Sequence, residues 1–209
     1  MLFIYVLYNG NVMKPLKGIV VGIDEVGRGS WAGPLVVGAV ILKRPVIGLK
    51  DSKLLTRIQR ERFDEIIRRK AFAIGLGWVQ PSEIDALGLT ASIRTAIRLA
   101  LRQIRYEFDT IVIDGSFNFL ADDLRARAIP KADAQIPAVS AASVIAKVAR
   151  DRFMREIASQ YPHYGFETHV GYGTAAHVAA LQLHGACVLH RRSYRPVRAV
   201  IEASYAHPS

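Results

Sequence analysis

GIVVGIDEVGRG, residues 18–29, is the segment of the sequence that most clearly indicates the fold. Its first half is a short apolar run with several β-branched side chains, which is typical of a buried β-strand. The run ends at the acidic pair Asp24 and Glu25, and the turn Gly27-Arg28-Gly29 follows at once. Adjacent carboxylates can hold a hard divalent cation beside phosphate, and glycine lets a backbone approach a substrate closely. An acidic strand end that only faces water is the alternative, and this stretch alone does not separate the two.

A second acidic strand end is predicted at Asp114, which follows the buried run 110–113 and precedes Gly115. If this strand neighbours the first one, their ends lie roughly 5 Å apart, so both acids can share a metal. Taken alone, Asp-Gly favours a simple turn. The weight of Asp114 therefore comes from its pairing with Asp24. A third acid, Asp133, precedes a predicted long helix, and its alternative role is solvation of a loop.

The rest of the chain predicts a mixture of strands and helices. Runs rich in β-branched residues predict strands at 19–25, 35–42, 71–79 and 110–113, with the first two as neighbours in a hairpin or meander. Helical spacing predicts helices at 56–69 with Thr56 as N-cap, from Pro81 onward, at 91–105, at 138–159, and at 174–184 with Thr174 as cap. Strands early and helices late favour an α/β or α+β fold.

Hydroxyl and cationic side chains recur at steps of three and four within the predicted helix 138–159. They are Ser140, Ser143, Lys147 and Arg150, and this spacing places them on one helix face. Such a face could lie along a phosphodiester backbone, because hydroxyls, Lys and Arg commonly hold phosphate. A solvated helix face explains the same pattern nearly as well.

Length and charge narrow the class of protein. The chain has 209 residues, 51% of them hydrophobic, which suffices for one sizeable core. Lys and Arg number 28 against 18 Asp and Glu, a net charge of +10. This excess indicates a polyanionic partner, with nucleic acid favoured over an anionic membrane.

Three further features exclude other classes. The single cysteine, Cys187, excludes an internal disulfide and a Cys-based zinc site, fits a reducing cytosol, and is expected to pack in the interior. The six histidines show no tight metal-binding spacing and are predicted to be surface or structural residues. Residues 1–12 lack a cationic region and are too short to span a bilayer, so no signal peptide or membrane anchor is expected. Met13 is an alternative start to Met1.

Taken in order, these motifs resemble those of the ribonuclease HII family. The matching segments are Gly-Ile-Asp24-Glu25-Val-Gly-Arg28-Gly with Ala32-Gly33-Pro34, Asp51-Ser52-Lys53, Ile-Asp114-Gly, Lys-Ala-Asp133, Ser140-Ala-Ala-Ser143 with Ala146-Lys147, and Gly171-Tyr172-Gly173-Thr174. The resemblance extends from about residue 18 to the segment 190–194. It implies an α/β fold, namely a ribonuclease-H-like mixed β-sheet flanked by helices, with a helical C-terminal part. We expect an N-terminal extension at 1–17 and a single catalytic domain at 18–209.

The resemblance also implies an activity. Members of the family are expected to cleave the RNA strand of RNA–DNA hybrids and to incise 5′ to single ribonucleotides in duplex DNA. The products would carry 5′-phosphate and 3′-hydroxyl ends. The four matching acids, Asp24, Glu25, Asp114 and Asp133, would bind two divalent ions, Mg²⁺ or Mn²⁺. The expected partner is nucleic acid and not a membrane, and a cytoplasmic monomer is predicted.

Substrate-binding residues follow from the same resemblance. Gly27-Arg28-Gly29 would read the ribose 2′-hydroxyl mainly through backbone groups, and this hydroxyl is what distinguishes RNA from DNA. Tyr172 would stack on the deoxyribose that follows the ribonucleotide. Lys53, Ser143 and Lys147 are candidates for phosphate contacts. There are two departures from the family pattern, Ser30-Trp31 and Val170. Val170 stands in a position often held by lysine, and the loss of that lysine puts one backbone-phosphate contact in doubt.

Two rival interpretations remain at this stage. One is another two-metal nuclease of the same fold, such as a junction resolvase or a ribonuclease confined to long hybrids. The other is a binding protein that has kept the fold and lost the chemistry, which the presence of all four acids disfavours. Substrate choice and metal-dependent cleavage discriminate among the three.

Overall fold

The computed structural model describes residues 7–8, 11–12, 16, 18–49 and 52–206. Asp51, both candidate start residues and His207 lie outside these ranges, as does most of the expected extension 1–17. Within that extension, β1 (Leu7–Tyr8) and β2 (Asn11–Val12) pair in an antiparallel hairpin. Leu16 is buried against the end of the main sheet.

The centre of the molecule is a mixed five-stranded sheet in the order β5-β4-β3-β6-β7. Its strands are β3 (Val20–Val26), β4 (Leu35–Leu42), β5 (Ala71–Val79), β6 (Thr110–Asp114) and β7 (Ala126–Ile129). β3, β4 and β5 form an antiparallel meander, whereas β6 and β7 join parallel to β3 and to each other. The four predicted strands are thus confirmed, and the predicted hairpin neighbours do pair.

The fifth strand, β7, is absent from the sequence prediction. Its four residues read Ala-Arg-Ala-Ile, and alanine is depleted in strands. The strand forms because β6 leaves an edge of unpaired backbone groups that a neighbour must satisfy. Pairing of Ile111 with Ala126 through Asp114 with Ile129 provides those partners.

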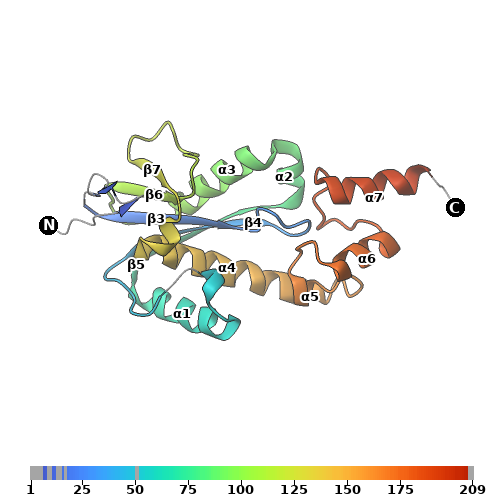
Figure 1. Cartoon of the computed structure of the whole chain (residues 1–209), viewed down its shortest axis with the longest axis horizontal. Coiled ribbons are helices and arrows are strands. Elements are labelled where there is room, and N and C mark those ends of the chain that lie inside the picture. Colours follow the sequence, from blue (N-terminus) through green and yellow to red (C-terminus); the bar gives the residue numbers. More distant parts are fainter. Residues whose placement is uncertain (1–6, 9–10, 13–15, 17, 50–51, 207–209) are drawn as a thin grey trace.

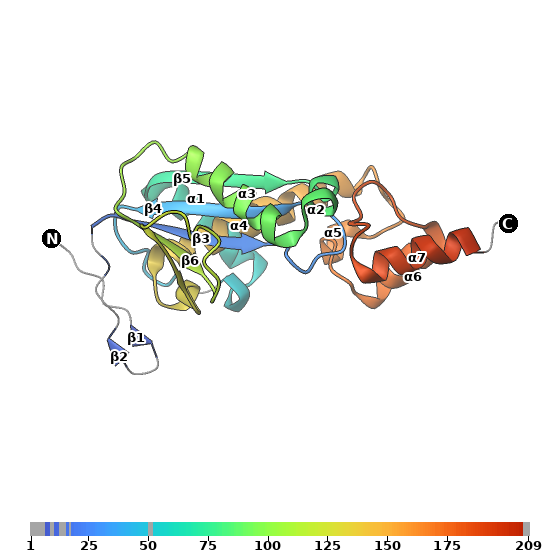
Figure 2. The same cartoon turned by 90° about the horizontal axis from the view of Figure 1, so that it is seen from above.

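Helices cover both faces of the sheet (Figures 1 and 2). On one face lie α2 (Pro81–Leu87) and α3 (Leu89–Arg102), and on the other α1 (Arg57–Lys70) and α4 (Pro137–Ala158). The predicted boundaries hold to within a few residues, and Thr56 caps α1 by accepting from the Gln59 N–H. No helix in the described part of the chain is long and apolar enough to cross a membrane.

Glycines let the helices lie directly on the sheet. A Cβ added at Gly22 would lie 2.2 Å from the Ala138 carbonyl carbon of α4, and one at Gly38 would lie 2.5 Å from the Ala142 oxygen. On the other face, a Cβ at Gly77 would lie 1.8 Å from the Ala96 oxygen of α3. Only glycine permits this approach. It brings the first turns of α4 against the acidic end of β3.

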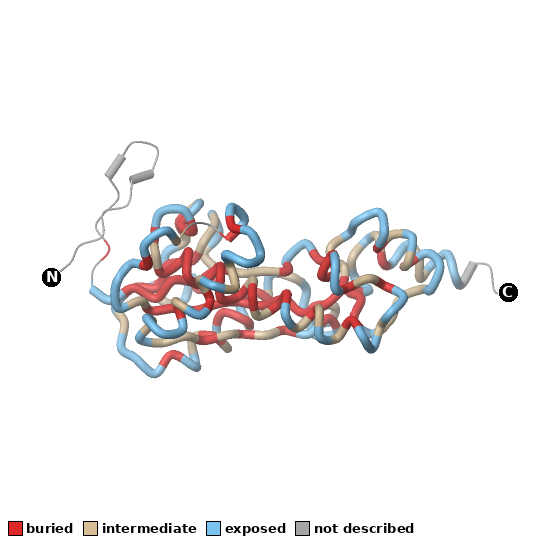
Figure 3. Tube along the Cα trace, turned by 90° about the horizontal axis from the view of Figure 1, so that it is seen from below, coloured by how far each residue is buried: buried red, intermediate tan, exposed pale blue. Residues whose placement is uncertain are grey.

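The C-terminal part, residues 159–206, extends beyond the sheet (Figure 1). It contains α5 (Phe166–His169), α6 (Ala175–His184) and α7 (Arg195–Ala206). Thr174 caps α6 as predicted, through the His177 N–H. Figure 3 shows one long buried band through the sheet and α4, and a smaller buried group in the C-terminal part. The helical C-terminal part that the resemblance implies is therefore present, although periodicity alone did not locate α5 or α7.

Candidate active site

The predicted acids meet at one edge of the sheet. β3 and β6 are parallel neighbours with Ile23 opposite Ile113, so Asp24, near the end of β3, lies beside Asp114, the last residue of β6. Asp133 lies on the short 3-10 turn η2 (Ala132–Ala134), and its backbone N–H donates to Asp114 Oδ1 at 3.4 Å. Asp24 Oδ1 accepts from the Glu25 N–H at 2.8 Å. The expected neighbourhood of the two strand ends is confirmed.

Lys53 lies among these acids. Its Nζ is 3.3 Å from Asp133 Oδ2, and its charge lowers the pKa of each of Asp24, Glu25 and Asp114. Lys53 is carried by the turn η1 (Ser52–Leu54). Predicted only as a phosphate contact, it also forms an ion pair with an acid of the cluster.

Two side chains hold η1 in place. Ser52 Oγ and Ser143 Oγ of α4 are 2.8 Å apart. Arg60 donates from its guanidinium to the Ser52 carbonyl at 3.2 Å and to the Leu55 carbonyl at 2.6 Å. Sequence reasoning missed Arg60, because one arginine on a densely charged helix face has no distinguishing spacing.

Burial opposes ionisation of the acidic cluster. Desolvation raises the pKa of Asp24 well above its ordinary value, and the negative charges of Glu25 and Asp114 raise it further, against a hydrogen bond from Ser143. Desolvation also raises the pKa of Glu25, which Arg28 partly offsets, and that of Asp114, where Asp133 adds to the rise. The cluster carries more negative charge than its surroundings neutralise.

The donor chemistry of this cluster suits a hard divalent cation. All four candidate ligands are carboxylates, which Mg²⁺ and Mn²⁺ prefer, and a cation would relieve the repulsion that adds to the raised pKa values of Asp24, Glu25 and Asp114. In this conformation no three acidic, histidine or cysteine side chains of the described residues already form a metal ligand set.

A groove of about 250 Å³ opens beside the acids. It is lined by Asp24, Glu25, Val26, Gly27, Arg28, Gly29, Ser52, Lys53, Arg60, Ser143, Lys147 and Tyr172. Every residue predicted to bind substrate is in this lining. Asp114 and Asp133 lie next to the groove and do not line it.

The Gly27-Arg28-Gly29 turn is held from behind by the C-terminal part. The Arg28 carbonyl accepts from Tyr194 Oη at 2.6 Å and from the buried Arg191 guanidinium at 3.3 Å. Arg191 also donates twice to the Gly33 carbonyl. The Arg28 side chain is exposed and lies 3.7 Å from Glu25, and a Cβ added at Gly29 would meet open space. The turn thus presents its backbone to the groove from a rigid support.

Comparison with known proteins identifies the family. The family profile described as Ribonuclease HII matches residues 21–197. The chain belongs to the ribonuclease HII family. Ribonuclease HII of Paracidovorax citrulli is 46% identical over 187 residues, covering 88% of this chain and 78% of the relative, and that of Delftia acidovorans is 45% identical over 194 residues, covering 91% and 82%. Family membership makes this chain a metal-dependent ribonuclease that cleaves RNA in RNA–DNA hybrids.

Solved structures agree on the ribonuclease-H-like fold. The ribonuclease H2 from Pyrococcus horikoshii OT3 is 28% identical with a TM-score of 0.77, covering 91% of this chain and 100% of that one. The ribonuclease HII in the PCNA:RNase HII complex from Archaeoglobus fulgidus is 25% identical with a TM-score of 0.74, covering 87% and 96%. The fold class implied by the sequence resemblance is confirmed.

The prediction of a polar face on α4 that is exposed to solvent or phosphate is wrong in part. Arg150 is fully buried and donates to the carbonyls of Pro34, Val170 and Ala32 at 2.9, 2.9 and 3.0 Å. Ser140 is buried as well and donates to the Asp133 carbonyl. Only Lys147 remains partly exposed on this face, paired with Asp151 at 2.9 Å. Regular spacing cannot distinguish a polar face in water from one that satisfies buried carbonyls.

Tyr172 lies beside α4, at the groove. Its half-buried ring lies 5.4 Å from Lys147 Nζ and 5.5 Å from the Arg150 guanidinium carbon. The segment before it is constrained, since Val170 has a φ of 45° and Gly171 one of 86°. A Cβ at Gly171 would lie 2.2 Å from the Ala32 oxygen. The ring therefore projects toward the groove from a tightly held loop.

The two departures from the family pattern both lie against this loop. Trp31 packs on the His177 ring at 5.6 Å between centroids, and Gly173 contacts its indole. Ser30 is fully buried, and its Oγ has no hydrogen-bond partner among the described residues. Val170 is also buried, and it packs inside the C-terminal part.

Proposed function

We propose that this chain cleaves the RNA strand of RNA–DNA hybrids and also incises duplex DNA on the 5′ side of a single ribonucleotide. The observation that supports this is the shared groove, in which Asp24 and Glu25, the Gly27-Arg28-Gly29 turn and Tyr172 face one space. An acidic site for phosphodiester chemistry thus adjoins a backbone turn suited to a 2′-hydroxyl. Products with 5′-phosphate and 3′-hydroxyl ends are expected.

Asp24, Glu25, Asp114 and Asp133 would hold two divalent ions, either Mg²⁺ or Mn²⁺. When bound, two such ions activate a water and stabilise the charge that develops on both sides of the phosphorus. The structurally similar Bst-RNase HIII, at 21% identity, has been solved in complex with Mn²⁺. Lys53, beside Asp133, would keep the acids partly neutralised before ions bind.

The other groove residues would bind and orient the nucleic acid. Lys53, Lys147 and Arg60 provide cations for backbone phosphates, and Ser143 provides a hydroxyl. Gly27-Arg28-Gly29 would contact the ribose through its backbone, and Tyr172 would stack on the deoxyribose that follows. A stacked sugar on the DNA side allows recognition of one ribonucleotide within DNA.

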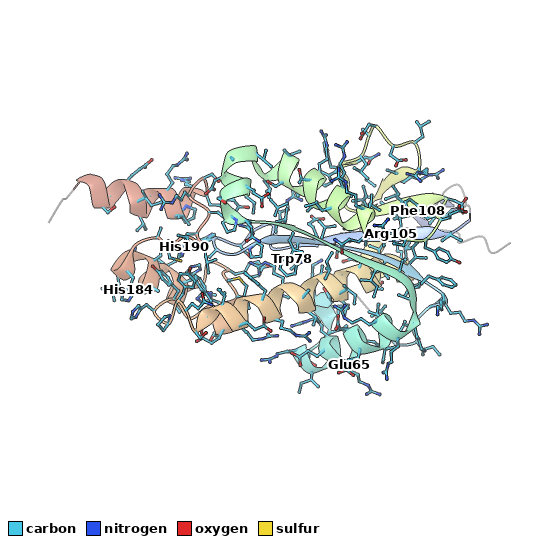
Figure 4. All side chains as sticks on the ribbon, turned by 180° about the vertical axis from the view of Figure 1, so that it is seen from behind. Glu65, Trp78, Arg105, Phe108, His184 and His190 are labelled. Carbon is cyan, nitrogen blue, oxygen red and sulfur yellow. The ribbon has the colours of Figure 1, made fainter. Side chains whose placement is uncertain are left out.

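The deciding experiment uses an end-labelled DNA duplex with one ribonucleotide beside an RNA strand paired with DNA. Each is incubated with Mg²⁺, with Mn²⁺ and with chelator. We expect metal-dependent incision 5′ to the lone ribonucleotide and cleavage of the hybrid. Asp24→Asn should abolish both reactions and largely spare duplex binding, whereas Glu65→Gln, an exposed acid on α1 (Figure 4), should change neither.

The alternatives predict different products. Cleavage confined to the long hybrid would assign the chain to a sister class of nuclease, and binding without cleavage of either substrate would favour the binding-only interpretation. Full turnover by Asp24→Asn would refute the assignment of the acids.

We also propose that residues 18–209 act as one catalytic domain, as a monomer in the cytoplasm. The buried band that runs from the sheet through α4 toward the C-terminal part supports a single domain. The single cysteine supports a reducing compartment. Light scattering with size exclusion tests the monomer, and a dimer mass would contradict it.

A further inference from the structure

Three buried histidines lie behind Tyr172, outside the acidic site. They are His169 at the end of α5, His177 in α6, and His190, which forms an isolated bridge with Ala32. Figure 4 places His190 toward the sheet and His184 farther out. The rings of His169 and His177 stack at 4.4 Å with an interplanar angle of 16°. Their role is not explained by the chemistry of the acids.

Only one assignment of donors and acceptors is possible for the hydrogen bonds of His190 and His177. The Cys187 backbone N–H donates to His190 Nδ1 at 3.0 Å, so this nitrogen carries no proton. The proton of neutral His190 is then on Nε2, 3.1 Å from His177 Nε2, which must accept it. His177 therefore carries its own proton on Nδ1, which donates to the Tyr172 carbonyl at 3.0 Å. An amide donor at one end and a carbonyl acceptor at the other determine both tautomers.

His169 holds the other side of the same loop. The Gly171 N–H donates to His169 Nδ1 at 3.2 Å, so His169 Nε2 carries the proton and donates to the Tyr164 carbonyl at 2.6 Å. The backbone on each side of the Tyr172 Cα is thus bound by one of two stacked imidazoles. Each ring accepts at one nitrogen and donates at the other, and this is possible only while it is neutral.

We infer that His177, His190 and His169 are positioning residues that fix the Tyr172 backbone, and so set discrimination of a lone ribonucleotide from a continuous hybrid. The inference rests on the stacking role proposed above for Tyr172. A small displacement of a substrate-positioning group carries a large cost in rate. Protonation of any of the three rings places a donor against a donor and releases the loop.

The same contacts argue against a single metal ion held by both Cys187 and His177. Cys187 Sγ lies 3.2 Å from His190 Nδ1. His177 contacts the other ring nitrogen of His190, Nε2, on the opposite side of the imidazole. No single ion can contact Cys187 and His177 while both flank His190. Burial favours the neutral rings that these hydrogen bonds require. It lowers the pKa of His190 to about 4 and lowers the pKa of His177 as well.

The tautomers can be measured without any activity assay. Ring nitrogen shifts of ¹⁵N-histidine-labelled protein at neutral pH distinguish protonated from unprotonated nitrogens. We expect protons on Nε2 of His190 and His169 and on Nδ1 of His177. A charged ring or the opposite tautomer at His177 or His190 would overturn the inference.

Variants connect the tautomers to selectivity. His177→Phe keeps the ring volume and removes both hydrogen bonds, and it should lower kcat/KM on the lone-ribonucleotide duplex by about tenfold while largely sparing the long hybrid. His177→Asn keeps a donor in the Nδ1 position and should recover most of this loss. His184→Phe, at an exposed histidine seven residues further along α6, is the matched control.

The outcomes separate this inference from the proposed function. If Tyr172→Ala loses selectivity and folded His177→Phe does not, the positioning role is wrong and the role of Tyr172 stands. If Tyr172→Ala changes both substrates equally, the stacking role is wrong, and an unchanged selectivity in His177→Phe then refutes the positioning role as well. If His177→Phe fails to fold, the comparison of His177→Asn with wild type decides, and an equal loss on both substrates contradicts the inference.

Discussion

The core beneath the sheet and the buried group in the C-terminal part differ in their side chains and in the interactions that hold them. The core between the sheet and α3 is aliphatic, with side chains such as Ile23, Val37 and Ile97 almost fully buried. The buried group in the C-terminal part is formed by aromatic rings, histidines and the guanidinium of Arg150. The first is held by non-directional burial of apolar surface, and the second by directional hydrogen bonds to backbone carbonyls. A part held by directional bonds can position a loop accurately, and it is also more sensitive to single substitutions.

The two parts also respond oppositely to acid. The carboxylates at the sheet edge have raised pKa values, so their protonation relieves strain as the pH falls. His177 and His190 have lowered pKa values, so their protonation is resisted until the pH is well below the ordinary value. The predictions below use these contrasts.

The largest effect is expected from Arg150→Met. It leaves the carbonyls of Pro34, Val170 and Ala32 without their donor, and each buried unpaired group is costly, so the free energy of unfolding should fall by about 3 kcal/mol or more. Arg152→Met, at an exposed residue on the same helix, is the control. Urea unfolding measures both variants. Equal stability of the two would show that the C-terminal part does not depend on this hydrogen-bonded centre.

The second prediction concerns acid and the histidines. The folded-state pKa of His190 lies near 4, below the ordinary 6.5, so the neutral ring stabilises fully above pH 6.5 and loses its contribution as the pH falls toward 4. The loss should be on the order of 3 kcal/mol. The titratable groups facing His190 are His177, His169, Tyr164 and Cys187. Hydrogen exchange should show the C-terminal part opening in this window before the sheet, and simultaneous opening would contradict this.

The third prediction addresses the close contact between α3 and the sheet. Gly77→Ala forces a methyl group against the Ala96 carbonyl, which cannot move without shifting the helix. We expect a loss of roughly 1–3 kcal/mol in the free energy of unfolding. Gly29→Ala, where nothing lies within 4 Å of an added Cβ, is the control for stability. A thermal melt of each variant is sufficient, and an unchanged midpoint for Gly77→Ala would disprove the close approach.

The smallest effect is a gain in stability. The pKa of Asp24 is raised in the folded protein because burial disfavours its ionised form. The folded protein therefore loses stability as the pH rises and Asp24 ionises. Asp24→Asn should therefore raise the free energy of unfolding by about 1 kcal/mol at neutral pH in chelator. Added Mg²⁺ should narrow the difference, since the ion stabilises only the wild type. A destabilised variant in chelator would show that the acids are not strained.

Much of the fold was predictable from local pattern. The β-branched runs located β3, β4, β5 and β6, and Thr56 and Thr174 marked helix starts correctly. β7 escaped because its four residues carry no strand signal, and α7 because little of its surface is buried apart from Val197. The histidines were predicted to be surface or structural residues, and the five that the structure describes agree with this. Their spacing did not show which three are buried together.

Local sequence was sufficient to place the acids, because Asp24, Glu25 and Asp114 lie at or near the ends of strands that their own neighbours specify. The ordered motifs were sufficient to indicate the family. The surroundings of the acids depend on long-range folding. Lys53 came to lie beside Asp133, 80 residues away, and Arg150 became a buried support in place of a phosphate ligand. The physical reason is that periodicity encodes which face of an element is apolar. The carbonyls that a buried Arg or His must satisfy come from distant segments, and only folding brings those segments together.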